Sequence, residues 1–445
     1  MFNRHRYRWT ELWLLVLPSL FLLLALFELL VVHNLNVAVS TNKLPPLDVF
    51  TPAFGLIAAL FAAHILLVII APDADQTLLP IAGMLTSIGV VMSLRLGPDI
   101  GQQNLGIKQL VVAIGGLAIC VVTVWATRDL SWIRNYKYTW AAVGLVLVAI
   151  TLVHAHSFGT NAPSRDVLTI GSGGLSFQPS EILKICLVIF FAGYLSENRE
   201  MLAASYLHVG PLRLPPLKHL GPLVLMLGMA LLIIIVVKEQ GLAILIFGLF
   251  LAMLYVASDR PTYVAGAIVA FALGAIAIFN IFPYTQQRVA IVGNAFETTP
   301  VDVAHTAGYQ IVQGLIAFAN GGVFGSGLGL GKSYIVPFSN TDYISASFGE
   351  EFGFAGILAL VGLFMLLVYR GMHIATRARS SFNQLLAVGL TAVFALQTIV
   401  ILAGNLKLLP LTGIPLPFVA YGGSSLIANY IIIGLLLRLS QDMPS

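Results

Sequence analysis

Three carboxylates lie in a short polar stretch, FSNTDYISASFGEEFGF at residues 338–354, just ahead of a long apolar segment. Ser347 and Glu350 have the spacing of a capping box, in which a hydroxyl and an acidic side chain cap a helix start. The helix dipole also favours carboxylates in the first turn, which suits Glu350 and Glu351. The pattern therefore predicts a structural, capping role for Ser347, Glu350 and Glu351. Asp342 lies upstream of the predicted cap, where it serves a turn or acts as a catalytic group.

A second polar cluster, LSFQPSEILK at residues 175–184, combines an acid and a base. Pro179 suits the first turn of a helix, and Glu181 suits its dipole. Lys184 follows three residues later on the same helix face. A lysine this close to the apolar core is costly unless it pairs or reaches water. Two interpretations stay open: an internal Glu181–Lys184 pair, or a Lys184 ammonium that faces an anionic lipid headgroup.

A glycine-rich segment, GSGLGLGKS at residues 325–333, invites comparison with nucleotide-binding loops. A P-loop would need glycine where Ser326 stands, and a dinucleotide fingerprint would need glycine where Leu330 stands. Neither motif is present. We expect tight turns that bring backbone N–H groups near an anion or another helix.

A third segment, PLTGIPLPFVAYGGSSL, is rich in proline and glycine and precedes an apolar helix that Ser424 or Ser425 is expected to cap. It contains no G-x-S-x-G elbow, so a serine hydrolase is not indicated. The nine histidines include no H-E-x-x-H pair, which argues against a catalytic zinc site. Cys120 and Cys186 both lie in apolar runs, which favours neither a disulfide framework nor a thiolate metal site.

The composition places these motifs in a membrane. The 445 residues are 58% hydrophobic and 9% charged, with a mean hydropathy of +0.93. Soluble domains carry about 25% charged residues. We therefore expect an all-α, polytopic integral membrane protein in contact with membrane lipids, and the net charge of +4 gives no support for nucleic-acid binding.

About 20 apolar residues cross a bilayer core, and by that rule the sequence predicts twelve membrane helices. They fall near 11–32, 52–71, 78–96, 108–126, 138–154, 180–196, 221–237, 240–257, 262–282, 346–370, 384–405 and 423–440. The first follows a basic N-terminus and is interpreted as a retained anchor.

Orientation follows from the positive-inside rule. With both termini in the cytoplasm, most of the 23 Lys and Arg residues fall inside. Segments 155–179, 283–345 and 406–422 then face outward. The middle one is the longest, and we expect a structured loop that partly dips into the membrane.

Four segments together resemble the SEDS family (shape, elongation, division and sporulation), which includes RodA, FtsW and SpoVE. They are GGLSFQPSEILK, YQIVQGLIAFANGGVFGSGLG, TDYISASFGEEFGF and LPLTGIPLPFVAYGGSSLIAN, in the family's order and spacing. The resemblance implies a ten-helix core over residues 76–445, with a large extracytoplasmic loop at 283–345. Residues 1–75 would form an N-terminal extension with two further transmembrane helices.

The resemblance also implies a peptidoglycan glycosyltransferase of the bacterial cytoplasmic membrane. Such an enzyme polymerises lipid II, the undecaprenyl-pyrophosphate-linked disaccharide-pentapeptide, at the outer face, in cell-wall elongation, division or sporulation. A divalent cation, Mg²⁺ or Mn²⁺, is the implied cofactor. A class B penicillin-binding protein, which cross-links the glycan, is the implied partner.

Site residues follow from the same resemblance. The family's essential aspartate has a T-D-[FY]-I context, which corresponds to Asp342, as a base or as the ligand of the divalent ion. Arg288 matches a charged loop residue of the family, and Glu181 and Lys184 occupy the Q-P-S-E motif. Basic residues expected to contact the substrate's phosphates are Arg288, Lys184, Arg165 and Lys332.

The sequence also departs from the family pattern. The loop before the Q-P-S-E motif lacks a tryptophan, although Arg165 is present. Asn340 stands where histidine is common, and Gly314 stands where the family has serine. These departures keep open a weakly active scaffold that recruits a transpeptidase. Many helices and an intramembrane charge such as Lys184 would also suit a lipid II flippase.

Overall fold

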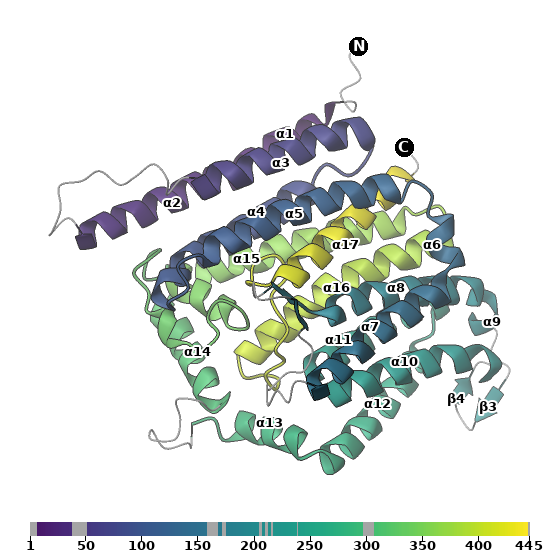
Figure 1. Ribbon diagram of the computed structural model, residues 1–445. Coiled ribbons are helices and arrows are strands. Elements are labelled where there is room, and N and C mark those ends of the chain that lie inside the picture. Colours follow the sequence, from purple (N-terminus) through teal and green to yellow (C-terminus); the bar gives the residue numbers. More distant parts are fainter. Residues whose placement is uncertain are drawn as a thin grey trace.

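The computed structural model describes residues 7–37, 51–157, 168–170, 175–203, 207–209, 212–214, 217–237, 239–296 and 307–443. These residues form a bundle of long helices with two small antiparallel hairpins in the connections (Figure 1). The helical fold class predicted from composition is confirmed.

The elements follow in chain order. They are α1 (Trp9–Leu14), α2 (Val16–Val37), α3 (Thr51–Ile70), α4 (Leu78–Asp99), α5 (Leu105–Ala126), α6 (Ser131–Asn135), α7 (Lys137–Ser157), β1 (Leu168–Ile170), β2 (Leu175–Phe177), α8 (Pro179–Glu197), α9 (Arg199–Ala203), β3 (Leu207–Val209), β4 (Leu212–Leu214), α10 (Leu217–Val237), α11 (Gln240–Ser258), α12 (Pro261–Ile281), α13 (Pro283–Gly293), α14 (Ala307–Gly321), a 3₁₀ turn (Ser333–Ile335), α15 (Ile344–Thr376), α16 (Ser381–Asn405) and α17 (Gly423–Gln441).

Ten stretches of helix within the described residues are long and apolar enough to cross a membrane, and the first combines α1 with most of α2. Shorter apolar stretches lie at Lys137–Thr151 in α7 and Gly221–Val237 in α10. Each predicted membrane segment overlaps one of these twelve stretches, with ends that differ by a few residues. The protein is therefore a multi-pass membrane protein.

Helix α15 is two helices in line. Gly353 has φ 68° and ψ −169°, which interrupts the helix near its start. A Cβ at this position would lie 2.3 Å from the backbone N of Gly325 and 2.5 Å from the carbonyl O of Val323. Only glycine tolerates this backbone and this close approach. We call residues 344–352, which precede the break, the half-helix.

The glycine-rich loop satisfies the backbone groups that the break exposes. The N–H groups of Ser326 and Gly327 donate to the carbonyls of Glu350 and Glu351, at 2.9 and 3.1 Å. On the other side of the break, Phe354 N–H donates to the Gly322 carbonyl at 2.9 Å. These bonds confirm the prediction that the glycines bring backbone N–H groups to another helix, and they replace the helical bonds lost at the break.

The capping role predicted for Ser347, Glu350 and Glu351 is wrong. Helix α15 begins at Ile344, so these residues lie in its second and third turns, and the Ser347 hydroxyl donates to the Ser339 carbonyl at 3.1 Å. The cause is packing, because Tyr343, at the helix start, is fully buried and extends the helix upstream of the apolar run. The predicted cap of α17 is also wrong, since its N-cap is Gly422 without a side-chain cap.

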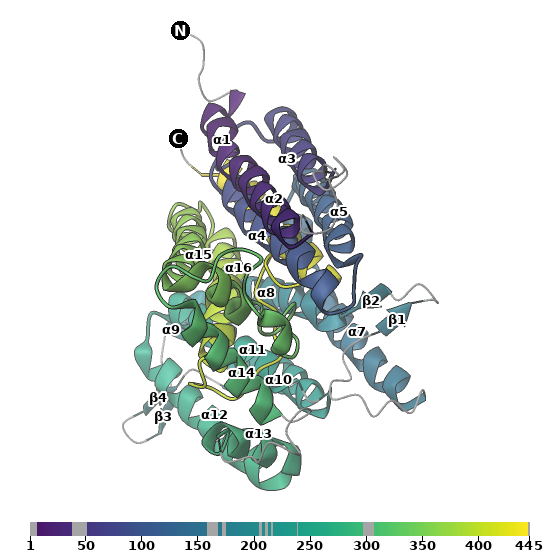
Figure 2. The same ribbon diagram turned by 90° about the vertical axis from the view of Figure 1, so that its left-hand side faces the viewer.

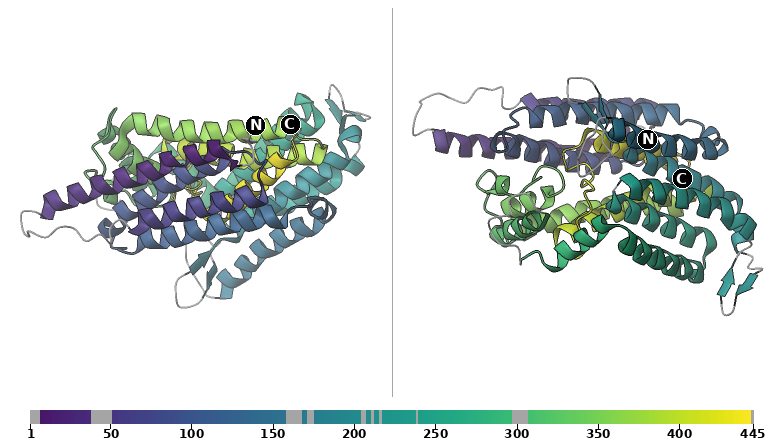
Figure 3. Two further views of the ribbon diagram at one scale, coloured as in Figure 1. Left: turned by 90° about the horizontal axis from the view of Figure 1, so that it is seen from above. Right: turned by 60° about the horizontal axis from the view of Figure 1, so that its bottom comes forward.

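Both termini lie at the same end of the bundle (Figures 1 and 3). The Arg8 guanidinium donates to the carbonyls of Ala71 and Ala74, each at 2.8 Å. Asp75, three residues before α4, pairs with Arg370 near the end of α15 and donates its N–H to the hydroxyl of Ser440 in α17. Because α15 ends near this end of the bundle, its first residues lie at the opposite end.

The N-terminal helices pack along the core. Figure 2 shows α1, α2 and α3 beside α4 and α5. In the second half of α2, the Glu28 carboxylate accepts a hydrogen bond from the N–H of Leu328 at 3.3 Å. A Cβ at Gly329 would lie 3.3 Å from the side chains of Leu29 and Val32. The first helices therefore contact the same glycine-rich loop that completes the break in α15.

Candidate functional site

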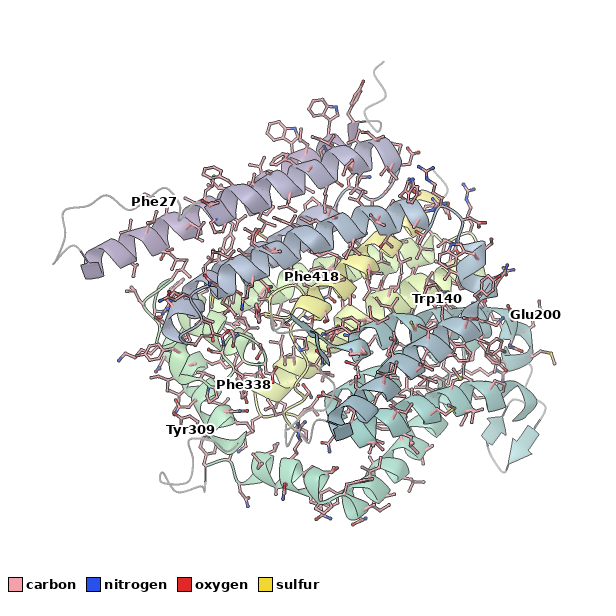
Figure 4. The ribbon with its side chains drawn as sticks, in the orientation of Figure 1. Phe27, Trp140, Glu200, Tyr309, Phe338 and Phe418 are labelled. Carbon is pink, nitrogen blue, oxygen red and sulfur yellow. The ribbon has the colours of Figure 1, made fainter. Side chains whose placement is uncertain are left out.

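Asp342 lies in a turn that directly precedes the half-helix. Its side chain is partly exposed, and its carbonyl accepts a hydrogen bond from the Asn405 amide at 2.8 Å. The same amide nitrogen donates to the Ser345 hydroxyl at 2.7 Å. Because Asn405 is the last residue of α16, that helix fixes the position of the turn. Figure 4 shows Phe338, four residues before Asp342, on the side of the bundle away from Glu200.

The Asp342 carboxyl binds its proton more tightly than an ordinary aspartate does. Partial burial, which removes water from the carboxyl, raises its pKa to about 6, and the positive charge of Arg288 limits the rise. The Arg288 guanidinium is held by the Leu411 carbonyl at 3.0 Å. Across the described chain, the Asp342 carboxylate has no hydrogen bond or ion pair of its own. It is therefore a carboxylate available to a ligand and close to a cation.

Segments far apart in the sequence meet around this turn. Tyr421 N–H donates to the Asn340 carbonyl at 2.9 Å. Gln178 N–H donates to the Ser424 hydroxyl at 2.9 Å, which joins the start of α8 to the start of α17. The ends of the three segments predicted to face outward therefore lie at one end of the bundle.

Gly314, a departure from the family pattern, has a packing explanation. A Cβ at this position would lie 2.5 Å from Cε1 of Tyr343. The Tyr343 ring, which is fully buried, thus occupies the space that a larger residue in α14 would need. Glycine at 314 and tyrosine at 343 fit one another.

Glu181 and Lys184 form an ion pair with one another, which is the first of the two interpretations that the sequence left open. Their charged atoms are 2.7 Å apart, and both side chains are buried. The Lys184 ammonium also donates to Gln397 Oε1 at 3.0 Å, and the Gln397 amide donates to the Pro415 carbonyl at 2.7 Å. The cluster joins α8 and α16 to the proline-rich segment. Contact of Lys184 or Glu181 with a substrate stays a prediction.

Glu350 and Glu351 have structural partners. Glu350 accepts a hydrogen bond from the Ser333 hydroxyl at 2.7 Å. Glu351 forms an ion pair with Arg95 of α4, at 2.9 Å between Oε1 and Nε. Sequence reasoning missed Arg95, because nothing local to α4 indicates a partner from so distant a segment.

The remaining predicted residues lie elsewhere or outside the described chain. Lys332 is exposed, and its side chain forms no hydrogen bond or ion pair with the described residues. Arg165 lies outside the described residues, as does the loop position where the family has tryptophan. The structure therefore brings together Asp342 and Arg288 among the predicted polar residues, and separately Glu181 and Lys184.

A divalent cation would have to share its ligands with a substrate. The described part of the chain contains no group of three or more His, Cys, Asp or Glu side chains able to hold a metal ion. Asp342 offers one carboxylate that is not otherwise engaged. Hard cations such as Mg²⁺ commonly bind one or two carboxylates together with water and substrate phosphates. The donor set fits a cation of that kind.

Comparison with known proteins places this arrangement in a family. Residues 75–444 match the FtsW/RodA/SpoVE family of cell cycle proteins. The chain belongs to this family. As an FtsW/RodA/SpoVE member, it is 34% identical over 402 residues to the peptidoglycan glycosyltransferase RodA of Mycobacterium leprae, covering 88% of this chain and 84% of the relative. It is 30% identical over 377 residues to a probable peptidoglycan glycosyltransferase FtsW of Geobacter metallireducens, covering 83% and 95%.

Solved structures share the fold of this FtsW/RodA/SpoVE chain. A peptidoglycan synthase complex contains a chain with a TM-score of 0.64 and 22% identity, covering 83% of this chain and 98% of that one. The rod shape determining protein RodA of Thermus thermophilus gives a TM-score of 0.56 at 21% identity, covering 84% and 98%. The SEDS architecture expected from the sequence motifs is thereby confirmed.

Proposed function

We propose that this chain is a peptidoglycan glycosyltransferase that polymerises lipid II at the outer face of the bacterial cytoplasmic membrane. The family and its named relatives support glycosyl transfer. The observation that carries the proposal is Asp342, a partly exposed carboxylate with a pKa near 6 beside Arg288, at the end of the bundle opposite the termini.

Asp342 acts as the general base. The hydroxyl oxygen of the acceptor sugar bonds to the anomeric carbon of the donor, while the bond from that carbon to the pyrophosphate oxygen breaks. The hydroxyl proton passes to Asp342, and the pyrophosphate leaves with the electron pair. A base with a pKa close to the working pH is largely ionised and still holds a proton well, which suits this task.

Arg288 supplies positive charge to the leaving group. A guanidinium binds phosphate through charge-assisted hydrogen bonds. The Leu411 carbonyl orients it from the segment that follows α16, and Asn405, the last residue of α16, positions Asp342. The end of α16 and the segment after it therefore place both the base and the cation.

When bound, Mg²⁺ or Mn²⁺ would neutralise charge on the pyrophosphate. In the alternative to the base role, Asp342 would hold the ion, with substrate oxygens and water as its other ligands. Lys184, Glu181, Arg165 and Lys332 are proposed as further substrate contacts.

The proposed topology has both termini in the cytoplasm, so the Asp342 end faces outward and receives lipid II laterally from the outer leaflet. A class B penicillin-binding protein is the proposed partner, since polymerised glycan must then be cross-linked. Both proposals follow the family resemblance and the distribution of basic residues.

The decisive experiment uses the purified full chain in liposomes with fluorescent lipid II, with and without Mn²⁺. Lengthening glycan chains on a gel are expected. A change of leaflet without polymer would instead identify a flippase. If the chain alone shows neither activity but makes polymer when an inactive penicillin-binding protein is added, it is a partner-dependent enzyme. If no polymer forms under either condition, the proposal is rejected.

A further inference from the structure

The half-helix is mechanically separate from the rest of α15. The break at Gly353 removes the continuous helical hydrogen bonding that would otherwise transmit position along the helix. Asp342 lies one residue before the N-cap of this short piece. The orientation of the Asp342 turn therefore depends on what holds residues 344–352 at each end.

At its amino end, the half-helix is held by α16. The Asn405 amide donates to the Asp342 carbonyl and to the Ser345 hydroxyl, at 2.8 and 2.7 Å. This is direct contact with the proposed site. These two hydrogen bonds fix only the amino end of the half-helix. A short helix that is held at one end can still tilt.

At its carboxyl end, the half-helix is held by α4 through Arg95. The guanidinium pairs with Glu351, donates to the Gly331 carbonyl at 2.8 Å, and pairs with Asp99 on its own helix. Arg95 is 9% exposed, and the Glu351 side chain is fully buried. A buried charge that loses its partner is strongly destabilising locally, so this pair fixes where residue 351 can lie.

The glycine-rich loop reinforces the same end. Ser326 and Gly327 donate their N–H groups to the carbonyls of Glu350 and Glu351, and Ser333 donates its hydroxyl to the Glu350 carboxylate. Since Arg95 binds both this loop and the half-helix, its guanidinium sets the position of the two together.

We propose that Arg95 is a positioning residue for Asp342, acting through the half-helix from its far end. The inference rests on the proposed function, in which Asp342 is the base. Reacting groups must be placed within about 1 Å, and a misplacement of that size costs on the order of 100-fold in rate. Loss of Arg95 should therefore lower kcat while leaving KM for lipid II nearly unchanged.

The test compares four variants of the full chain. Arg95→Gln should lower kcat by about 10–100-fold, with KM changed by less than about threefold. Arg95→Gln combined with Glu351→Gln removes both buried charges and should recover a large part of kcat. Arg95→Lys keeps the positive charge but not the forked N–H donors of the guanidinium, so its kcat should be intermediate. Arg370→Gln is the matched control, because it breaks a second ion pair of α15, with Asp75 at the terminus end.

Hydrogen exchange supplies a readout that needs no catalysis. Backbone amides of residues 338–345 should exchange faster in Arg95→Gln than in the wild type, recover in the double variant, and stay unchanged in Arg370→Gln. If wild-type protein makes no polymer but exchange follows this pattern, the proposed function fails and the coupling holds. Unchanged exchange and unchanged kcat in Arg95→Gln, or equal losses in Arg370→Gln, would overturn the inference. Should Arg95→Gln not fold, Arg95→Lys and the double variant decide it.

Discussion

Carboxylates at the two ends of the half-helix are held in opposite ways. At the carboxyl end, Glu350 and Glu351 are buried, and each contacts a fixed polar partner, Ser333 or Arg95. At the amino end, Asp342 is partly exposed and lies in the field of Arg288, without a hydrogen bond or ion pair to its carboxylate in the described chain. A carboxylate with fixed partners stabilises the structure. One that is positioned through its backbone alone is free to exchange a proton.

At the end of the bundle where the termini lie, charged side chains have fixed partners, as Glu350 and Glu351 do. Arg8 pairs with Glu11, whose other oxygen is 2.7 Å from His64. Asp75 pairs with Arg370. The first set of charges joins α1 and α3 to the segment before α4, and the second joins that segment to α15. Both resemble the Glu351 end rather than the Asp342 end. The comparison therefore separates charges with fixed partners from the carboxylate that is proposed as the base.

The largest expected effect removes the base. Asp342→Asn should lower kcat for polymerisation by about 10³-fold or more, because general base catalysis contributes about 10²–10⁴. Glu350→Gln is the control at the other end; its amide oxygen still accepts from Ser333, and kcat should stay within about tenfold of wild type. Product chains are quantified by gel at equal expression. Near-normal glycan from Asp342→Asn, or equal losses in both variants, would remove the distinction between the two ends.

The next effect concerns the break that creates the half-helix. Gly353→Ala forces a Cβ to within 2.3 Å of backbone at positive φ, and should cost about 2–4 kcal/mol of stability. Gly362→Ala is the control, since it lies in the same helix with nothing within 4 Å of the new Cβ. It should be neutral or stabilising by up to about 1 kcal/mol. Thermal unfolding in detergent measures both, and a tolerated Gly353→Ala would contradict the break as described.

A smaller expected effect is that removal of the Asp342 carboxylate makes the folded protein more stable. The folded protein binds the Asp342 proton more tightly than the unfolded chain, because the pKa rises from 3.8 to about 6. This contribution is complete below pH 3.8 and is lost as the pH rises through 6. Asp342→Asn avoids that loss, so it should be more stable than wild type by about 1–3 kcal/mol at pH 7.5. The difference should vanish near pH 4, and a destabilised variant at pH 7.5 would contradict it.

Local patterns predicted the fold well where length and polarity decide the outcome. Each apolar run of the sequence became a helix, and the T-D-Y-I motif directed attention to Asp342. The break at Gly353 was missed, because the apolar run continues through it and glycine is common in membrane helices. Ser347 looked like a cap because the pattern ignores the buried Tyr343 that starts the helix earlier.

Contacts between distant segments were beyond sequence reasoning. Arg95 and Glu351 meet only because α4 packs beside α15. Asn405 holds Asp342 for the same reason, since α16 ends beside the turn. The spacing of Glu181 and Lys184 did allow their pair to be proposed, because both lie on one helix face.

The smallest effect concerns pH, and it tests the Asp342 end directly. A base with a pKa of about 6 is about nine-tenths ionised at pH 7 and about one-tenth ionised at pH 5. Polymerisation should therefore fall about tenfold between pH 7 and pH 5. Because the charge of Arg288 lowers the pKa, Arg288→Gln should move the midpoint of this fall to higher pH. The control is Arg370→Gln, which removes a charge at the other end of the bundle. The pH midpoint of its initial rates should equal that of the wild type. A midpoint near 4 in the wild type would mean that Asp342 is solvated like an ordinary surface carboxylate, and the contrast between the two ends would not extend to chemistry.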